Sequence, residues 1–561
     1  MRAAYPLILL QHGHRTTLVH SCLLRLGAPQ EVAWGKPTLA TIAPLDYDRN
    51  VELRLKFHTD RGLKTSEAVD TLKSEDAMQE TIEANKETPT KTLASLGVAA
   101  AAEAIRKGEI SSESYASALL QRARDHVDLN SFITIDDGTV LEAARNADKA
   151  IASGSTAPLL GVPIAIKDSY LTKGLRTTIG LSALGSFVPE HDADAVQAIK
   201  DGGGIVFGKN NLVEMSFGLT GHNQAYGQAK NPHNTSHVSG GSSGGGGASV
   251  AACLVPASLG GDTIGSIRVP ASLCGVVGFK PTTGRWPRSG VAPISHTLDT
   301  TGVFARSVDD CILIDRVVTR DETPDNNAHA GLKGITLAYA PRQYLELVAP
   351  EVATQFERTL RQLRDAGAKV MEVDLGQDFT GRALSATWNI FFRETKAAVE
   401  GFIRQNNVPI SFDEIVDSLK PGLKDVWTRL VLPTGQGYIS DEVYHRALGA
   451  ERKEIKRRYA EAFLSTGAEA LLLPTTPSTA PMIGQEDRII LGGQETSQLV
   501  LANNTIPASA AGLPGISLPI GLSDKGLPVG LEMDGPFGRD RALLYVARRV
   551  ENVLGTLQAT V

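Results

Sequence analysis

Cysteine is scarce in this chain. The 561 residues include only four cysteines, at positions 22, 253, 274 and 311, and no two of them form a CxxC pair. The sequence therefore indicates neither a disulfide framework nor a zinc knuckle. Low cysteine usage of this kind favours a reducing compartment, and we expect the protein to be cytoplasmic.

Long apolar runs are also missing. We find no stretch of about 18 or more apolar residues free of charge, which disfavours a membrane-spanning helix. The first residues, MRAAYPLILLQHGHR, contain a short apolar run that Pro6 interrupts, with no small-residue cleavage site after it. We therefore expect neither a signal peptide nor a membrane partner.

Positive charge is not in excess. Lys and Arg total 56 against 62 Asp and Glu, so the net charge is -6, and the basic residues are scattered. A nucleic-acid partner is not expected, because such binding needs a clustered basic surface. With 42% hydrophobic residues the chain can bury a large core and an active site, so a small molecule is the expected partner.

The chain has no repeat of fixed period and divides by pattern instead. Residues 1–90 show no clear periodicity, and we regard them as an N-terminal appendage of undefined role, followed by one main domain over residues 91–561. Residues 93–109 and 111–128 place apolar residues at steps of three and four, which predicts two amphipathic helices, the second capped by Ser111 or Ser112.

The main domain alternates between strand and helix patterns. From residue 158 to about 310, short β-branched runs such as GVPIAIKD and GGIVFGKN alternate with small-residue helical runs, which is typical of an α/β fold with a parallel or mixed sheet. Residues 320–465 open with GLKGITLAYAP, an amphipathic helix and the strand AKVMEVDL, and continue as charged helices. We interpret them as a helical cap inserted into the core. Residues 466–561 return to short apolar strands.

Residues 239–247 read SGGSSGGGG and have three competing interpretations. A flexible linker is disfavoured because apolar sequence typical of a domain interior follows at once. A phosphate-binding loop would need a lysine directly after Gly247, and none is there.

The third interpretation is a nucleophile elbow, since residues 240–244 match G-x-S-x-G. The preceding NPHNTSHVSG is poor in strand-forming residues, however, whereas an elbow follows a strand directly. A Ser-His-Asp esterase therefore stays open only as a less favoured alternative. The downstream histidines that could act as its base are His296, His329 and His445.

Two further segments complete a candidate site. GGDTIGSIR, residues 260–268, is a second small-residue turn with Ser266 near its end, and GVPIAIKD ends an apolar strand on Lys167. A lysine buried among apolar residues is unfavourable unless it is neutralised or paired, which indicates a chemical role. Ser266, Ser242 and Lys167 form a candidate nucleophile, bridge and base.

The order and spacing of GVPIAIKD, GGSSGGGGASVAA and GGDTIGSIRVPASLCGVVGFKPTTGR resemble those of the amidase signature family of Ser-cisSer-Lys hydrolases. The resemblance is strong over residues 92–320 and looser over residues 466–555. The C-terminal LPGISLPIGLSDKGLPVGLEMDGP is similar to the branch that contains mandelamide and indoleacetamide hydrolases.

This resemblance implies an α/β/α sandwich around a large mixed sheet and an activity without a cofactor. It implies that Lys167 is the base, Ser242 a serine on a cis peptide, and Ser266 the nucleophile. The backbone N–H groups implied to form the oxyanion hole belong to Thr263, Ile264, Gly265 and Ser266. The residues implied to support them are Gly241, Ser243, Asp262 and Arg268.

The residue types suit this chemistry. A serine hydroxyl needs a neutral base at neutral pH, and apolar neighbours of Lys167 favour loss of its proton. Ser243 stays open as an alternative relay serine. Asp262 and Arg268 either pin the turn or form a simple structural ion pair.

Ile264 departs from the family pattern, which usually has Gly-Gly before the nucleophile. Its N–H survives as a donor, but its side chain is unfavourable if φ must be positive, and it would narrow the acyl pocket. His233 and His237 have i, i+4 spacing, but Pro232 and Asn234 disfavour a helix there, so no metal site is expected.

The leading hypothesis is an amide hydrolase that releases ammonia or an amine from an uncharged aryl or other hydrophobic amide. Esters and carbamates could react as well, because the acyl-enzyme chemistry is shared. The alternative is an amidotransferase component of the A type, as in glutamyl-tRNA amidotransferase, which passes ammonia to a partner chain. A homodimer also stays open, because members of the family are often homodimers.

Overall fold

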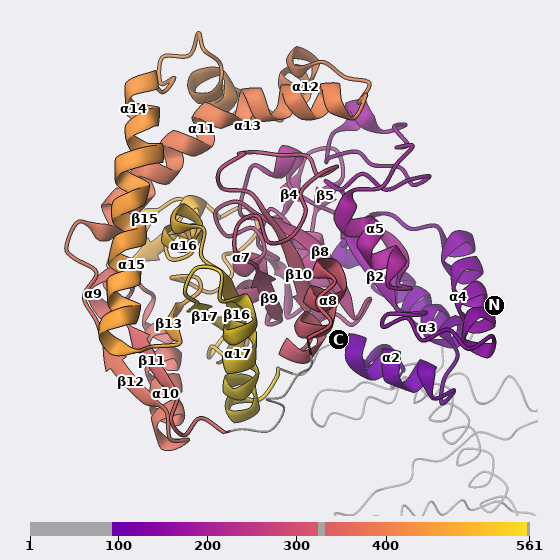
Figure 1. The fold of residues 1–561 in the computed structure, drawn as a ribbon. Helices are drawn as coiled ribbons and strands as arrows, with labels where there is room; N and C mark the ends of the chain where they lie inside the picture. The colour runs from indigo at the N-terminus through magenta and orange to yellow at the C-terminus, as the bar shows by residue number, and fades with distance from the viewer. Residues whose placement is uncertain (1–92, 324–330, 558–561) are drawn as a thin grey trace, which may run out of the picture. The chain divides into compact units, whose positions relative to one another are not determined.

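The computed structural model describes residues 93–323 and 331–557, so the predicted appendage over residues 1–90 lies outside the described residues. An eleven-stranded mixed sheet forms the centre, with strand order β1-β3-β2-β8-β10-β9-β16-β17-β13-β11-β12 (Figure 1). Helices flank this sheet, which confirms the α/β fold expected from the sequence. The strands of the sheet are β1 Phe132–Thr134, β2 Pro163–Lys167, β3 Ile205–Asn210, β8 Ala257–Asp262, β9 Val277–Lys280, β10 Thr300–Ala305, β11 Thr336–Tyr339, β12 Lys369–Glu372, β13 Ala470–Pro474, β16 Gly515–Leu522 and β17 Pro528–Asp534.

Six shorter strands pair outside this sheet as three two-stranded ribbons. They are β4 His222–Asn223 with β5 Gly227–Gln228, β6 Lys230–Asn231 with β7 Asn234–Val238, and β14 Ile489–Leu491 with β15 Gln494–Thr496. The presence of β7 corrects one expectation, because the segment before Ser239 was expected to lack a strand. Three residues of β7 are exposed, which is why its sequence lacks the apolar character of a buried strand.

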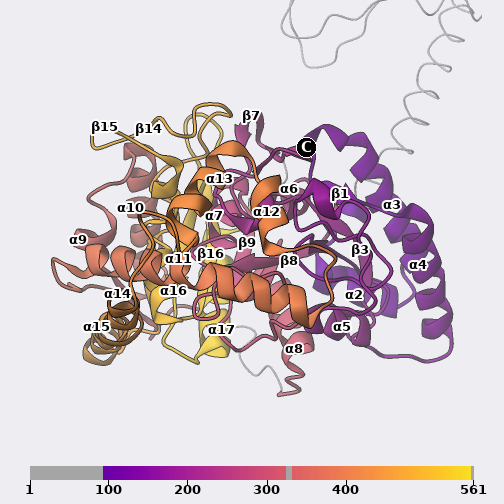
Figure 2. The same cartoon turned by 90° about the horizontal axis from the view of Figure 1, so that it is seen from above.

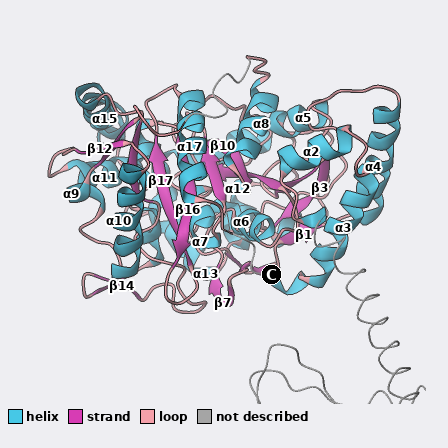
Figure 3. Ribbon diagram, turned by 90° about the horizontal axis from the view of Figure 1, so that it is seen from below, coloured by secondary structure: helices cyan, strands magenta, loops and turns pink. Residues whose placement is uncertain are grey.

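Helices lie on both faces of the sheet, with α5, α8 and α17 along one side and α6 and α7 along the other (Figure 3). The helices packed around the sheet are α2 Val98–Arg106, α3 Ser112–Asp125, α4 Asp137–Ala152, α5 Asp194–Asp201, α6 Gly244–Ala251, α7 Arg268–Cys274, α8 Val308–Thr319, α10 Pro350–Asp365, α16 Ile506–Ala511 and α17 Asp540–Leu554. The two helices predicted first are α2 and α3, and the hydroxyl of Ser111 caps α3 by accepting from the N–H of Ser114.

Helices of the predicted cap region run along the top and left of the core in Figure 1, and Figure 2 shows the same layer from above. They are α9 Pro341–Tyr344, α11 Phe379–Gln405, α12 Phe412–Ser418, α13 Pro421–Val426, α14 Asp441–Arg446 and α15 Arg452–Thr466. The first part of residues 320–465 lies elsewhere: β11 and β12 extend the edge of the sheet beside β13, and α10 packs on β13. β11 has a parallel neighbour on each side, and its two central residues are buried, as expected of an interior strand.

The glycine-rich stretch at 239–247 leads directly into α6, whose residues are all buried. A Cβ at Gly245 would lie 2.3 Å from the carbonyl oxygen of Ser131 and 2.6 Å from the backbone nitrogen of Asn211. Only glycine permits this close approach of two backbones. The stretch is therefore part of the packed core, and the linker interpretation is wrong.

The sheet places two of the predicted segments side by side. β2 ends at Lys167 and pairs in parallel with β8, which ends at Asp262. Because parallel neighbours finish at the same edge of a sheet, Lys167 lies beside the turn that follows Asp262.

Arg268 is fully buried just behind this turn and connects four elements. Its guanidinium forms ion pairs with Asp262 at 3.0 Å and with Glu532 on β17 at 2.6 Å. It also donates to the carbonyl oxygen of Thr505 at 3.0 Å and to Oγ of Ser509 on α16 at 2.8 Å. The sequence left open whether Asp262 and Arg268 form a simple ion pair or also hold the turn. They do both, because Asp262 accepts hydrogen bonds from the N–H groups at the start of α7.

We predict that Arg268→Met lowers the free energy of unfolding by about 3–5 kcal/mol, because it leaves the buried carboxylates of Asp262 and Glu532 without a cation. Urea denaturation followed by circular dichroism measures this loss. Arg145→Met is the control, since its pair with Glu113 is half exposed and should be worth less than about 1 kcal/mol. An equal decrease in the free energy of unfolding in the two variants would contradict the stabilising role assigned to Arg268.

Candidate active site

A buried lysine and a buried serine meet at the end of β2. Nζ of Lys167 and Oγ of Ser242 are joined by a hydrogen bond of 2.7 Å, and both side chains are almost completely inaccessible. The peptide bond between Gly241 and Ser242 is cis. A lysine in this position can exchange a proton with the serine hydroxyl without passing through bulk water.

Burial lowers the pKa of Lys167 to about 7, although the carboxylates of Asp262 and Asp299 oppose this shift. Desolvation disfavours the charged ammonium, which is the usual reason for a depressed lysine pKa. Asp262 makes the larger of the two opposing contributions, and its carboxylate is also paired with the guanidinium of Arg268. A substantial fraction of Lys167 is therefore neutral at physiological pH and able to act as a base.

The turn at residues 263–266 offers a set of backbone donors. No hydrogen bond to another described residue engages the N–H groups of Ile264, Gly265 and Ser266. Gly265 has a φ of +141°, and a Cβ there would lie 2.3 Å from Oγ1 of Thr505. The left-handed backbone of the turn is thus assigned to glycine, where it has little steric cost.

Ile264 does not carry the strain that the sequence raised as a concern. The positive φ falls on Gly265, and Ile264 is not among the residues with a left-handed backbone. Its side chain is buried and lines a cavity beside Ser266, and its carbonyl oxygen accepts a hydrogen bond from Thr505. Ile264 is therefore a wall residue on an ordinary backbone.

Hydrogen bonds fix the turn to its neighbours on both sides. The N–H of Ser243 donates to the carbonyl oxygen of Ser266 at 3.3 Å, and the Ser243 hydroxyl donates to the carbonyl oxygen of Gly261. On the other side, the hydroxyl of Thr263 donates to the buried carboxylate of Asp299 at 2.7 Å. Ser243 thus supports the turn through the backbone, which leaves Ser242 as the serine bonded to Lys167.

A second buried carboxylate, Glu394 on α11, holds the loop that carries Asp299. It accepts from the N–H and hydroxyl of Thr297 at 3.0 and 2.6 Å, from the hydroxyl of Tyr444 at 2.8 Å, and from the hydroxyl of Ser295. Asp299 accepts from the backbone N–H of Ser295 on the same loop. The helical layer is thereby connected through this loop to the turn.

An apolar cavity of about 430 Å³ opens at Ser266. Its walls are mostly aromatic and aliphatic, and three aromatic side chains come from one face of α11 at helical spacing. The apolar residues that line it include Phe217, Leu219, Ile264, Trp388, Phe391 and Phe392. Such a cavity favours a flat hydrophobic group next to Ser266.

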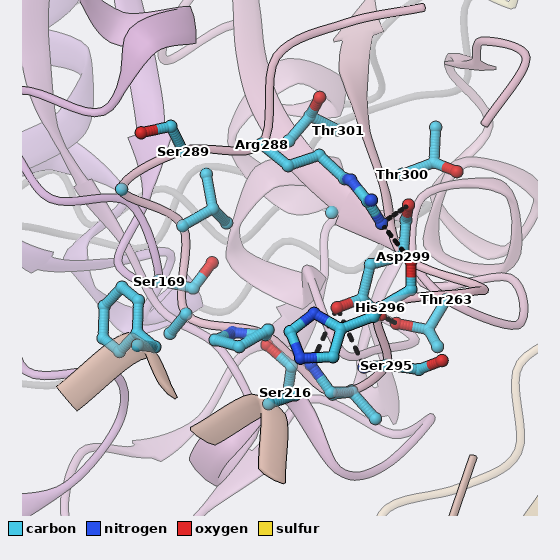
Figure 4. A pocket seen from close by; sticks show the side chains of 18 of the residues that line it. Ser169, Ser216, Thr263, Arg288, Ser289, Ser295, His296, Asp299, Thr300 and Thr301 are labelled. Carbon is cyan, nitrogen blue, oxygen red and sulfur yellow. Dashed lines mark hydrogen bonds between the residues drawn. The ribbon is translucent and has the colours of Figure 1, made fainter. Parts of the chain in front are cut away.

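A second, more polar cavity of about 180 Å³ opens at Lys167 and Ser242. Figure 4 shows its wall, with Arg288 extended beside Asp299 and Thr263 and with hydroxyl side chains around it. Ser216, Thr263 and Ile294 line both cavities, so the two meet at the turn.

The structure thus brings together Lys167, Ser242 and the 263–266 turn, as the three motifs indicated. It places the two histidines considered for a metal elsewhere: Nε2 of His233 lies 3.0 Å from the carbonyl oxygen of Cys274, and His237 is on β7. The sequence motifs did not indicate Asp299, Glu394 or the aromatic wall. The i, i+3, i+4 spacing of Trp388, Phe391 and Phe392 indicates one face of a helix. Such a face more often packs in the core than lines a cavity, so the spacing alone does not predict a binding site.

The family model described as Amidase matches residues 115–544. Indoleacetamide hydrolase of Allorhizobium ampelinum is 32% identical over 453 residues, which cover 80% of this chain and 96% of that protein. Mandelamide hydrolase of Pseudomonas putida is 34% identical over 465 residues, covering 80% and 90% of the two chains.

The A-type component of glutamyl-tRNA(Gln) amidotransferase from Desulforapulum autotrophicum is also similar, with 36% identity over 461 residues that cover 76% of this chain and 91% of that protein. Among solved structures, one described as an amidase superposes with a TM-score of 0.73 and 28% identity, covering 82% of this chain and all of the other. In the described part of the chain, every helix is too short or too polar to cross a lipid bilayer.

Proposed function

The chain belongs to the amidase family and is a hydrolase of amide C–N bonds, and we propose that it cleaves aryl or other hydrophobic carboxamides through an acyl-enzyme on Ser266. The observation that carries this proposal is the hydrogen bond between Lys167 and Ser242 beside the turn that bears Ser266. A lysine that is partly neutral and hydrogen-bonded to a serine can accept the proton of the nucleophile. The proposed reaction therefore needs no histidine as a base.

In the proposed reaction, Oγ of Ser266 attacks the amide carbonyl carbon and its proton passes through Ser242 to Lys167. The negative charge that develops on the carbonyl oxygen is stabilised by the unengaged N–H groups of Ile264, Gly265 and Ser266. Donors that are already oriented stabilise this charge without reorganisation. Thr263 would add a fourth N–H at the start of the turn.

Collapse of the tetrahedral intermediate breaks the C–N bond, and the same relay returns the proton to the departing nitrogen. Water then hydrolyses the ester on Ser266, releasing the carboxylic acid. Esters and carbamates could follow the same course, since both form an acyl-enzyme.

The preference for a hydrophobic acyl group follows from the cavity at Ser266. Burial of an aryl ring against Phe217 and Trp388 is favourable at about 25 cal/mol per Å² of apolar surface. This preference agrees with the names of two relatives, indoleacetamide and mandelamide hydrolase.

The similarity to the A-type component of glutamyl-tRNA(Gln) amidotransferases favours a second candidate function, in which ammonia released from glutamine passes to a partner chain. The aromatic cavity fits an aryl group better than a polar glutamine side chain. Incubating the purified chain alone with phenylacetamide and with glutamine, and measuring ammonia, separates the two. Release from glutamine but not from phenylacetamide would favour the amidotransferase function.

We predict that Ser266→Ala abolishes turnover and prevents covalent labelling by a fluorophosphonate, because the nucleophile is removed. Mass spectrometry of the intact protein measures the label. Ser243→Ala, which removes a hydroxyl bonded only to backbone, is expected to remain labelled. Persistent labelling of Ser266→Ala would move the nucleophile to another serine and contradict the assignment.

We predict that kcat/KM rises with pH through about 7 and levels off above it, because only neutral Lys167 accepts the proton and its pKa is about 7. Lys167→Ala should lower the acylation rate by about a hundredfold to ten-thousandfold and remove this ascending limb. Stopped-flow acylation between pH 5 and 9 provides the profile. An ascending limb that survives in Lys167→Ala would assign it to a different group.

We predict that Ile264→Gly raises kcat/KM for 1-naphthylacetamide relative to acetamide by about tenfold, because it enlarges the apolar cavity. Glycine also adds backbone freedom worth about 0.5–1 kcal/mol, which should slow both substrates to a similar extent. The ratio of the two kcat/KM values in wild type and variant isolates the cavity effect. An unchanged ratio would mean that Ile264 only holds the turn.

A further inference from the structure

The two cavities differ in which member of the candidate triad they reach. Ser266 and Ile264 line the apolar cavity, whereas Lys167 and Ser242 line the polar one. In the proposed reaction the departing nitrogen receives its proton through Ser242. The nitrogen must therefore face the polar cavity, with the acyl group in the apolar cavity on the other side of the carbonyl carbon.

Arg288 is the residue of the polar cavity best suited to bind an anion. Its Nη1 donates to the carbonyl oxygens of His296 at 2.9 Å and of Asp299 at 3.0 Å, which fixes the plane of the guanidinium. Its Nε and Nη2 have no hydrogen-bond partner among the described residues, and neither is a buried atom. This free edge is the one that arginine uses for two parallel hydrogen bonds to a carboxylate.

The lysine and the two carboxylates that line the same cavity have partners within the protein, and Nζ of Lys167 donates to Oγ of Ser242 at 2.7 Å. Asp299 accepts from the hydroxyl of Thr263 and from two backbone N–H groups, and the charge of Asp262 is paired with Arg268. Among the described residues no ion pair engages Arg288. Besides Ser242 and Thr263, the hydroxyl side chains that line the same cavity (Figure 4) are Ser169, Ser216, Ser289, Ser295, Thr300 and Thr301.

We propose that Arg288 makes the polar cavity a subsite for a carboxylate on the amine half of the substrate. The preferred substrates would then be secondary amides that join a hydrophobic acyl group to the nitrogen of an amino acid or a similar anionic amine. Hydrolysis of such a substrate releases the free acid and the amino acid. This inference rests on the proposed function, because that function determines which cavity receives the nitrogen.

The test compares N-phenylacetylglycine with N-isobutylphenylacetamide, which replaces the carboxylate by an isopropyl group of similar shape. Both release phenylacetate, so one chromatographic assay serves for both. We expect kcat/KM to be about tenfold to a hundredfold higher for the glycine amide, as for a charge-assisted bidentate contact. Equal values for the two amides would overturn the proposal.

Variants of Arg288 test the residue itself. Arg288→Met should reduce the ratio between the two amides to about one, and Arg288→Lys should keep part of it, since charge remains but the fork is lost. Arg288→Glu should instead prefer N-(2-aminoethyl)phenylacetamide, whose leaving amine is cationic. A ratio unaffected by Arg288→Met would overturn the assignment, and thermal melting of each variant checks that it is folded.

A binding measurement separates this proposal from the proposed function. In Ser266→Ala protein, calorimetry should find N-phenylacetylglycine bound about tenfold or more tightly than the isobutyl amide, and the additional Arg288→Met change should remove the difference. Tight, Arg288-dependent binding without turnover by wild type would contradict the proposed function but support the subsite. Turnover of phenylacetamide with no difference in binding would support the function and overturn the subsite.

Discussion

The position of the site depends on the ion pairs that the buried guanidinium of Arg268 forms with Asp262 and Glu532. This guanidinium joins the end of β8 to β17 and to the segment around α16, so it connects the sequence around the turn to the C-terminal part of the sheet. An ion pair in the interior is weak evidence for stability by itself, but removing one partner leaves an uncompensated charge. The 263–266 turn therefore has its position only when the C-terminal strands are in place.

Around this turn the molecule separates two environments. On one side lies an aromatic cavity that opens at Ser266, and on the other a more polar cavity lined by Lys167 and Ser242. Burial lowers the pKa of Lys167, and it also strengthens electrostatic interactions with the backbone N–H groups of the turn. The lowered pKa of Lys167 thus comes from burial of the lysine itself, and the apolar cavity beside Ser266 is a separate feature.

Strand and helix patterns predicted the α/β fold, whereas the proximity of Lys167 to the 263–266 turn was implied by the resemblance of three motifs to the amidase signature family. The sequence could not predict Asp299 or Glu394, whose roles depend on which loop and helix meet them in three dimensions. The pattern of residues 320–465 predicts an inserted cap that contains one strand, AKVMEVDL, but does not indicate that this strand, β12, and its neighbour β11 extend the central sheet. The backbone of Ile264 could be judged only from its dihedral angles.

Helix α11 places Trp388 and Phe391 on the apolar cavity beside Ser266 and, one turn later, binds the loop of Thr297 through Glu394. A helix moves as a rigid rod, so sliding or tilting it to admit a larger acyl group would also pull on that loop and displace the donors at the turn. Substitution of the side chains that α11 presents to the cavity can therefore change the substrate range while the helix stays in place. A change of substrate range that displaced the helix would lower the catalytic rate.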